Sequence, residues 1–261
     1  MLFPRLLIIA AFVTLLSLKA KGEIPFASYR NSDSAQISNF SMRLLLGTES
    51  YLENSDLASA LENHALFPAY EELGFFVSSG VSLGIGLPKL TNLSVGMVWA
   101  NFTSQTQFET TSQFIKYSKL NGDYWGLFLE YELPISKRFT LDLGFRFLHN
   151  RLNLDINESP RSNDPVVIFD GSSSLELEYK FNAINPYFII DYNIIDKKYY
   201  SFSTGLTIDY KYNLPNVVWK AYPNGIFDDW TQKDGRNIVD LPFLGNHVIG
   251  MGLSFTLSIY F

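Results

Sequence analysis

The end of the chain, residues 249–261, alternates apolar side chains with small or polar ones. One set comprises Ile249, Met251, Leu253, Phe255, Leu257, Ile259 and Phe261, and the other comprises Gly250, Gly252, Ser254, Thr256 and Ser258. Because successive side chains of a β-strand point to opposite faces, this period of two residues predicts a strand with one apolar face. The same pattern recurs along the chain and constrains its fold more than any other sequence feature.

Alternating segments separated by turn residues predict about eight strands. They span residues 40–49, 70–87, 92–109, 124–133, 139–156, 172–195, 199–213 and 247–261. Many are longer than an ordinary strand of roughly five or six residues. They also exceed the roughly 9 to 11 residues with which a tilted strand crosses a bilayer.

The links between these strands alternate strictly between short and long. The short links are residues 88–91, 134–138 and 196–198, and the long ones are residues 50–69, 110–123, 157–171 and 214–246. Transmembrane β-barrels alternate short periplasmic turns with long surface loops, whereas a soluble β-sandwich has no reason to do so. The sequence therefore predicts an all-β protein, a closed antiparallel transmembrane β-barrel of about eight strands.

The N-terminus has the order of a secretory signal peptide. Arg5 precedes an apolar run over residues 6–18, and the small-residue site Ala20-Lys21-Gly22 follows. The run is short for a membrane-spanning helix, which favours cleavage over retention as an anchor. We expect three parts: a signal peptide over residues 1–22, a periplasmic N-terminal segment over residues 23–39 and the outer-membrane barrel domain over residues 40–261.

Composition excludes several classes of protein. The chain has no cysteine, which rules out disulfides and a lipoprotein anchor on cysteine. Its formal net charge of -6, its pI near 5.1 and the lack of a basic run argue against a nucleic-acid partner. After residue 22 no apolar stretch reaches the length of a membrane-spanning helix.

The C-terminus resembles the signal that outer-membrane proteins present to the barrel-assembly machinery. Phe261 ends the chain, Ile259 lies two residues before it and Ser254 is polar, while Thr256 occupies the usual glycine position. By architecture the chain resembles the OmpA/OmpX/OmpW-like group of small outer-membrane barrels. The resemblance implies the outer membrane of a Gram-negative bacterium, with its lipids and the assembly machinery as partners.

A secreted soluble barrel is the competing fold. Its apolar face would point inward and its charged positions outward, so alternation alone does not separate the two folds. The terminal strand favours the membrane barrel. A further irregularity is expected in the strand over residues 172–195, where the apolar residues change from odd to even positions around Pro186. Proline favours bulges, so we predict a bulge over residues 184–186 that switches the face, or a break into two strands.

Charged positions opposite the apolar face are expected inside the barrel. They are Arg43, Glu130, Glu132, Asp142, Arg146, Glu176, Glu178, Lys180, Asp191, Asp209 and Lys211. Eight strands enclose an interior just wide enough for side chains to fill. Charges of both signs should pair there, because unpaired buried charge is costly. This predicts a filled lumen rather than a general diffusion porin, with an ion or proton pathway as the alternative.

Aromatic residues near the strand ends predict two interfacial belts. The belt near the short turns would contain Phe139, Tyr192, Tyr199, Tyr200, Tyr260 and Phe261, and the belt near the long loops would contain Tyr124, Trp125, Tyr210 and Tyr212. General core filling would explain the number of aromatics but not this grouping.

Histidines are the natural candidates for catalysis. Lipid A deacylases carry a histidine followed two residues later by serine, whereas Leu66, Arg151 and Ile249 follow His64, His149 and His247 here. We therefore predict no catalytic residue, no metal ligand and no cofactor. A triad assembled from distant strands remains an alternative.

The last long link combines aromatic and acidic residues. Its aromatics are Trp219, Tyr222, Phe227 and Trp230. They are expected to fold down as a lid over the barrel mouth or, if exposed, to bind a protein or a glycan at the surface.

Three function classes follow. The first is a non-enzymatic barrel acting in envelope structure, in surface recognition or as a subunit of an outer-membrane complex. The alternatives are a lipid-active enzyme with a site at the rim and a narrow transporter of small apolar solutes.

Overall fold

The structure is a computed structural model. It describes residues 39–52, 75–87, 90, 92–104, 107–110, 114–160, 173–214, 219–224, 237–238 and 245–260. The predicted signal peptide, residues 23–38, the terminal Phe261 and much of the long links lie outside the described residues. Among the residues described, no helix has the length and apolar character needed to cross a membrane.

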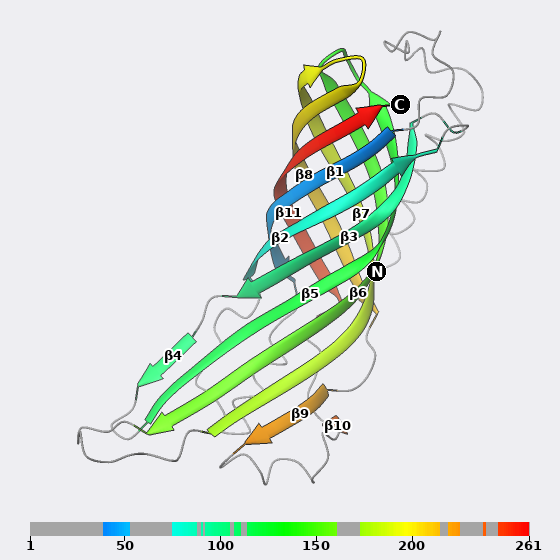
Figure 1. The fold of residues 1–261 in the computed structure, drawn as a ribbon. Coiled ribbons are helices and arrows are strands. Elements are labelled where there is room, and N and C mark those ends of the chain that lie inside the picture. Colours follow the sequence, from blue (N-terminus) through cyan, green and yellow to red (C-terminus); the bar gives the residue numbers. More distant parts are fainter. Residues whose placement is uncertain are drawn as a thin grey trace.

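The described residues form strands that enclose a closed barrel (Figure 1). The strands are β1 Asn39–Tyr51, β2 Phe75–Gly86, β3 Leu93–Ser104, β4 Gln107–Thr110, β5 Phe114–Pro134, β6 Phe139–Pro160, β7 Ser173–Asp196, β8 Tyr200–Leu214, β9 Trp219–Asn224, β10 Asn237–Ile238 and β11 His247–Tyr260. Strands β1, β2, β3, β5, β6, β7, β8 and β11 pair antiparallel in that order, and β11 pairs with β1. The predicted barrel of eight strands is confirmed.

The two terminal strands close the barrel along their whole length. Phe40 pairs with Ile259 at the short-turn end, and Tyr51 pairs with Val248 at the other end. The Leu52 N–H also donates to the His247 carbonyl at 2.9 Å. The final strand therefore closes against the strand that starts near residue 40, as its alternation predicts, and the ring has no free edge.

Three strands are much longer than the rest. Strands β5, β6 and β7 contain 21, 22 and 24 residues, whereas β2 and β3 contain 12 each. Past the ends of β3 and β8, β4 pairs with β5, β9 with β7 and β10 with β9. Residues 114–122, 150–160 and 173–181, together with β4, β9 and β10, thus form a sheet that we call the extension (Figure 1).

The extension corrects three predicted loops, one of them because β6 runs to Pro160, inside the predicted link over residues 157–171. Strand β5 begins at Phe114, inside the predicted link over residues 110–123, and β9 and β10 lie in the predicted link over residues 214–246. Polar residues such as Lys119 and Asn121 alternate there with Ser118 and Leu120. Outside a bilayer the exposed face of a strand is polar, so this segment lacks the regular apolar face by which the other strands were predicted.

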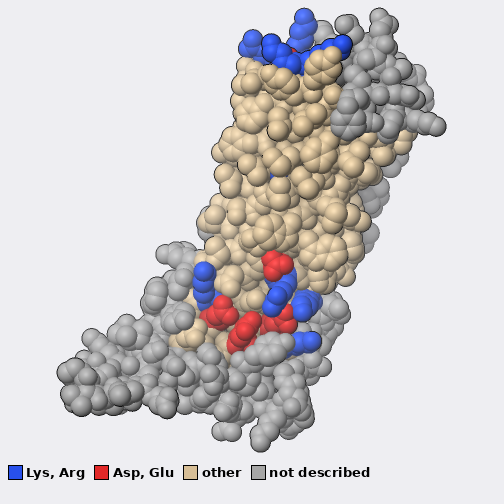
Figure 2. Space-filling model, in the orientation of Figure 1, with Lys and Arg blue, Asp and Glu red and all other residues tan. Residues whose placement is uncertain are grey.

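The outer face of the barrel wall is apolar. Leu127, Leu129 and Leu253 are 59%, 43% and 52% exposed, respectively, as expected for lipid-facing positions. On the face drawn in Figure 2, a band almost free of charged side chains lies between a basic end and a mixed charged end. Such a band matches a transmembrane barrel, and barrels of this type lie in outer membranes. For the barrel wall, this apolar outer face excludes the secreted soluble barrel, in which the apolar face would point inward.

Along β6 the apolar face changes sides while the backbone alternation continues. Phe145 and Phe147 face outward and Arg146 faces the lumen. Farther along, Arg151 is exposed while Leu152 is buried. Beyond it Leu154 and Ile156 are buried, and the odd-numbered residues 153, 155 and 157 are half-buried. Even-numbered residues of β6 face inward along its described length. The inward side chains change from polar to apolar along the strand, while the direction in which they point stays the same.

The same inversion explains why the apolar residues of β7 change from odd to even positions. Odd-numbered residues face inward continuously from Leu175 to Asp191, so no bulge switches the face around Pro186. The register shift lies instead at Asn193/Ile195, near the short turn. The predicted bulge and the predicted break are therefore both wrong: the apolar residues change parity because this strand passes from lipid into a region with an apolar interior.

Candidate functional site

The charged level of the lumen nearest the short turns is built around Arg43 of β1. Its guanidinium contacts Glu130 of β5 at 2.5 Å, Asp142 of β6 at 2.7 Å and Asp191 of β7 at 3.6 Å. Its Nε donates to the Thr256 Oγ1 of β11 at 2.9 Å. Because these partners come from different strands around the ring, the cluster crosses the lumen and ties its walls together.

A second level follows at Arg146 of β6. Its guanidinium lies 3.8 Å from the centre of the Tyr187 ring, and its Nη1 donates to the Asn185 Oδ1 at 3.3 Å. The Asn185 amide in turn donates to Asp209 at 2.9 Å. The Tyr187 hydroxyl donates to the Glu130 Oε2 at 2.8 Å, which links this level to the Arg43 cluster.

A third level pairs Lys211 of β8 with Glu49 of β1. The Lys211 Nζ lies 2.6 Å from the Glu49 Oε2, and both side chains are buried. The same ammonium group lies 4.4 Å from the centre of the Tyr124 ring and 5.6 Å from that of Phe102. The aromatic rings and the carboxylate together compensate a cation that has left water.

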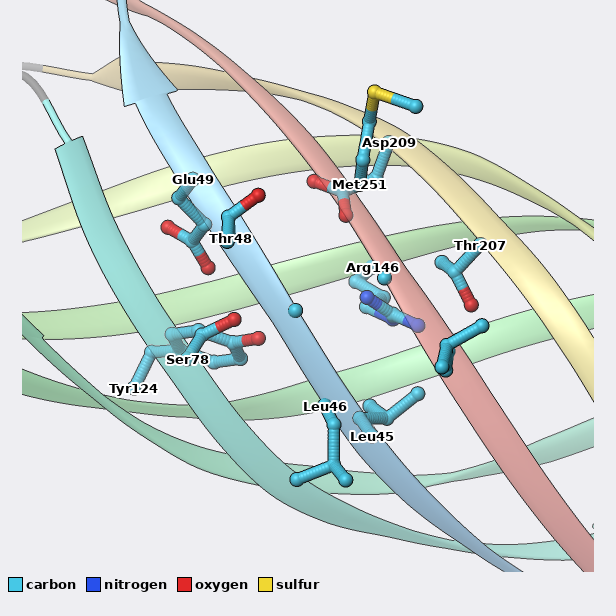
Figure 3. Close-up of a pocket in the computed structure, with 13 residues that line it drawn as sticks. Leu45, Leu46, Thr48, Glu49, Ser78, Tyr124, Arg146, Thr207, Asp209 and Met251 are labelled. Atoms are coloured by element: carbon cyan, nitrogen blue, oxygen red, sulfur yellow. The ribbon is translucent and has the colours of Figure 1, made fainter.

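A small cavity of about 30 Å³ lies between these levels (Figure 3). Its polar lining includes Glu49, Tyr124, Arg146, Thr207 and Asp209. The Arg146 Nε and the Thr207 Oγ1 have no hydrogen-bond partner among the described residues. The volume suits one or two water molecules and is far below the roughly 300 Å³ at which ligand pockets begin.

Beyond the third level the lumen is filled by an apolar core. Its members at this level include Tyr51, Phe76, Phe102, Leu120, Leu148, Leu152, Phe181 and Val248, each at most 5% exposed. The Phe76 ring packs edge-on against Tyr51 at 5.3 Å and against Phe102 at 5.5 Å. This core continues into the extension, so the loop side of the lumen is sealed by packed side chains.

Most of the predicted lumen charges lie where the alternation places them. Those inside are Arg43, Glu130, Asp142, Arg146, Asp191, Asp209 and Lys211, and Glu132 lies half-buried on the same face near the short-turn end. Glu49, Tyr187 and Asn185 were not predicted as part of the network. Glu49 shares the parity of Arg43 at the end of a predicted strand, so that signal was present in the sequence.

Three predicted lumen residues lie on the outer face instead: Glu176, Glu178 and Lys180. Glu178 is bound at 2.7 Å by the Arg151 Nε and at 3.0 Å by the Lys180 Nζ, two basic side chains about half exposed to solvent. They belong to the extension, where the polar face of the sheet is the outer one. The correction follows from the polarity inversion described above.

The described rim histidines lie on the outer wall among aromatic rings. His149 contacts the Asn182 side chain at 3.0 Å through its Nδ1, and its ring lies 5.7 Å from that of Trp125. His247 is hydrogen-bonded to the Tyr210 hydroxyl and packs against the Tyr212 ring at 5.4 Å. Such amphipathic rings suit the headgroup level of a membrane. Within the described ranges, no group of three metal-ligating side chains is found.

The predicted aromatic groups are only partly at the surface. Tyr124 points into the lumen and is buried, which removes it from the outer belt near the long loops. Trp219 is also buried, at the start of β9, with its ring 5.1 Å from that of Tyr179. It therefore packs in the extension rather than on an exposed binding surface. Tyr222 lies in β9, and Phe227 and Trp230 lie outside the described residues.

No protein-family model matches the chain, and no curated protein matches it. Solved structures with a similar overall fold include a major outer membrane protein from Thermus thermophilus, with a TM-score of 0.46, 9% identity and coverage of 86% of this chain and 99% of that one. Neisserial surface protein A has a TM-score of 0.37 and 12% identity, with 86% and 97% covered. The outer membrane protease OmpT from Escherichia coli has a TM-score of 0.36 and 9% identity, with 90% and 100% covered. At TM-scores below 0.5, these similarities carry no argument about the function of this chain.

Proposed function

We propose that this chain is a non-conducting, non-enzymatic outer-membrane barrel that anchors the extension at the cell surface, where it serves in recognition or as a subunit of an outer-membrane complex. The observation that carries this proposal is the inversion of polarity along β5, β6 and β7. It gives one end of the barrel a packed apolar interior and a polar exterior, as in a water-soluble sheet. Long strands with their own core are a rigid support for loops.

The closed lumen argues against transport. A solute crossing from the short-turn end would meet the Arg43 cluster, then the Lys211–Glu49 pair and then the apolar core. Passage would require separating buried ion pairs and opening packed side chains. The barrel therefore contributes anchorage, while the residues beyond the membrane contribute recognition of a protein or a glycan.

Planar-bilayer recording of the purified barrel tests the closed lumen. We expect no conductance or, at most, small flickering currents. Large stable steps would contradict the proposal. Insertion of an epitope between residues 160 and 173 tests surface presentation, because antibody should bind intact cells. Binding only after the outer membrane is permeabilised would place the extension on the opposite side.

The enzyme alternative is tested by mass spectrometry of lipid A and by digestion of model peptides. We expect neither to change when the barrel is overexpressed. A change in acylation or a peptide cleavage that disappears in His149→Ala or His247→Ala would establish an active site at the rim.

A further inference from the structure

The rim at the short-turn end is strongly basic. The two described turns that follow β5 and β7 carry Lys137, Arg138, Lys197 and Lys198, all exposed, beside the acidic residue Asp196. Figure 2 shows basic side chains gathered as a cap at one end of the molecule, directly adjoining the uncharged band. Since the whole chain has a formal net charge of -6, this accumulation of positive charge is local and does not follow from composition.

Hydrogen bonds hold these basic residues on one arc of the rim. The Asn193 N–H donates to the Arg138 carbonyl at 2.7 Å, which joins the two turns across neighbouring strands. The Ile135 N–H donates to the Phe139 carbonyl and the Lys197 N–H to the Tyr200 carbonyl, each at 2.9 Å. The cations thus extend from two closed, adjacent turns.

Aromatic side chains place these cations at the level of lipid headgroups. The Phe139 and Tyr192 rings pack at 5.1 Å on the outer wall, and the Arg138 Nη1 donates to the Tyr192 hydroxyl at 3.0 Å. The Lys198 Nζ lies 5.2 Å from the centre of the Tyr199 ring. Tyrosine rings with adjacent basic groups are typical of the membrane–water interface, where phosphate groups lie.

The charged zone at the other end differs in kind. Arg151 and Lys180 both bind Glu178, and Lys119 lies opposite Asp155 in the strand register. Basic charge is thus compensated locally by carboxylates near the extension. At the short-turn rim the four basic side chains outnumber the nearby carboxylates of Asp196 and Glu132, so a positive excess remains.

We propose that this rim binds the phosphate groups of anionic phospholipids, of the phosphatidylglycerol type, in the periplasmic leaflet of the outer membrane. The proposal rests on the placement of the barrel in a bilayer, with its short turns on the periplasmic side. Charge complementarity supplies the attraction, and the Tyr192 and Tyr199 rings hold Arg138 and Lys198 near the lipid surface. The lumen and the extension are not involved.

Spin-labelled lipids measure this preference directly. The purified barrel is reconstituted in phosphatidylcholine vesicles that contain a trace of spin-labelled phosphatidylglycerol or spin-labelled phosphatidylcholine. Electron paramagnetic resonance then gives the fraction of each label restrained by the protein. At low salt we expect roughly a fivefold preference for phosphatidylglycerol, the factor that one basic residue near an anionic surface typically contributes. In 1 M salt, where the screening length falls to roughly 3 Å, the preference should largely disappear.

The variant K137Q/R138Q/K197Q/K198Q should lose the preference, and the matched variant K119Q/R151Q/K180Q should retain it. Heat-modifiability on gels shows whether each variant is folded, and conductance and epitope exposure report the proposed function independently. An absent preference in the wild type, or a preference that survives the quadruple substitution, would overturn this inference while leaving the proposed function intact. If the quadruple variant does not fold, the salt dependence of the wild type still tests the inference. A preference for phosphatidylglycerol that persists in 1 M salt would overturn it.

Discussion

The membrane-spanning barrel and the extension share three strands, β5, β6 and β7, and have opposite polarity. In the barrel, Phe145 and Phe147 face lipid and Asp142 is inside. In the extension, Arg151 is outside and Leu154 is inside. Inward and outward positions alternate without interruption along β6. The outer face is apolar in the barrel, where it meets lipid, and the inner face is apolar in the extension, where it meets the packed core. A change in the parity of apolar residues therefore marks a change of solvent along a continuous strand.

The two regions are also stabilised in different ways. In lipid, ring closure satisfies the backbone, and the outer apolar face is already removed from water, so the interior can hold polar groups that pair. In water, burial of apolar surface must stabilise the sheet, which requires an apolar interior. This difference predicts where a given substitution is costly.

The largest expected effect is in the lumen. Arg43→Leu leaves Glu130, Asp142 and Asp191 without their shared cation, and loss of one partner from a buried charged cluster costs about 3–5 kcal/mol. Urea unfolding in micelles, followed by heat-modifiability, measures the loss. Thr256→Val is the control, since it removes one hydrogen bond of about 1 kcal/mol to the same guanidinium. Equal stability of the two variants would show that the cluster does not hold the walls together.

The next effect belongs to the interior of the extension. Leu154→Ala opens a cavity at a fully buried site and should cost about 2–5 kcal/mol. Leu143→Ala on the outer face of the same strand should cost less, because lipid chains fill the space. Hydrogen exchange of the β6 amides beyond residue 150 reports the difference. A larger loss for Leu143→Ala would contradict an extension stabilised by its own core.

A third substitution compares the two outer faces. Leu143→Arg places a charge on the lipid-facing wall and should cost about 2–4 kcal/mol near the bilayer midplane. Asn153→Arg places the same charge on the half-buried outer face of the extension, which faces water, and should cost about 1 kcal/mol or less. Refolding yield into vesicles measures both. Similar losses at both positions would place the bilayer over the extension as well.

The smallest effect concerns Asp155 on the outer face of the extension. Burial raises the pKa of its carboxyl, against the opposing effect of Lys119, and the Asn121 amide donates to it at 3.1 Å. Because the folded carboxyl binds its proton more tightly than the unfolded one, this group stabilises the extension as the pH falls through the raised pKa. Asp155→Asn should remove that pH dependence and change stability at neutral pH by about 0.5 kcal/mol at most. Hydrogen exchange over a pH series checks both, and an unchanged pH profile in the variant would contradict this assignment.

Particular residues show how far the sequence could predict the site. Arg43, Glu130, Asp142 and Arg146 were assigned to the lumen because their neighbours on each strand are apolar. Glu178 and Lys180 were misassigned by the same rule, which treats the apolar face as the outer one. That rule holds in lipid and reverses in the extension. The change in parity of the apolar residues of β7 around Pro186 marks the boundary, but from the sequence it was interpreted as a bulge or a break. Trp219 was missed as a core residue because its partner Tyr179 lies on another strand.

The sequence by itself determined the barrel strands, their antiparallel closure and the apolar outer wall, because period-two alternation and link length are local properties of the chain. Only the tertiary structure decided where the wall ends and the extension begins. It also decided which charges meet, since Arg43 pairs with carboxylates 87 and 99 residues away, Glu130 and Asp142. Pairing depends on which strands lie opposite one another around the ring, and the spacing of residues along one strand does not encode this. A parity change along one strand fits either a bulge or a change of solvent, and only the register and burial of the folded strands distinguish the two.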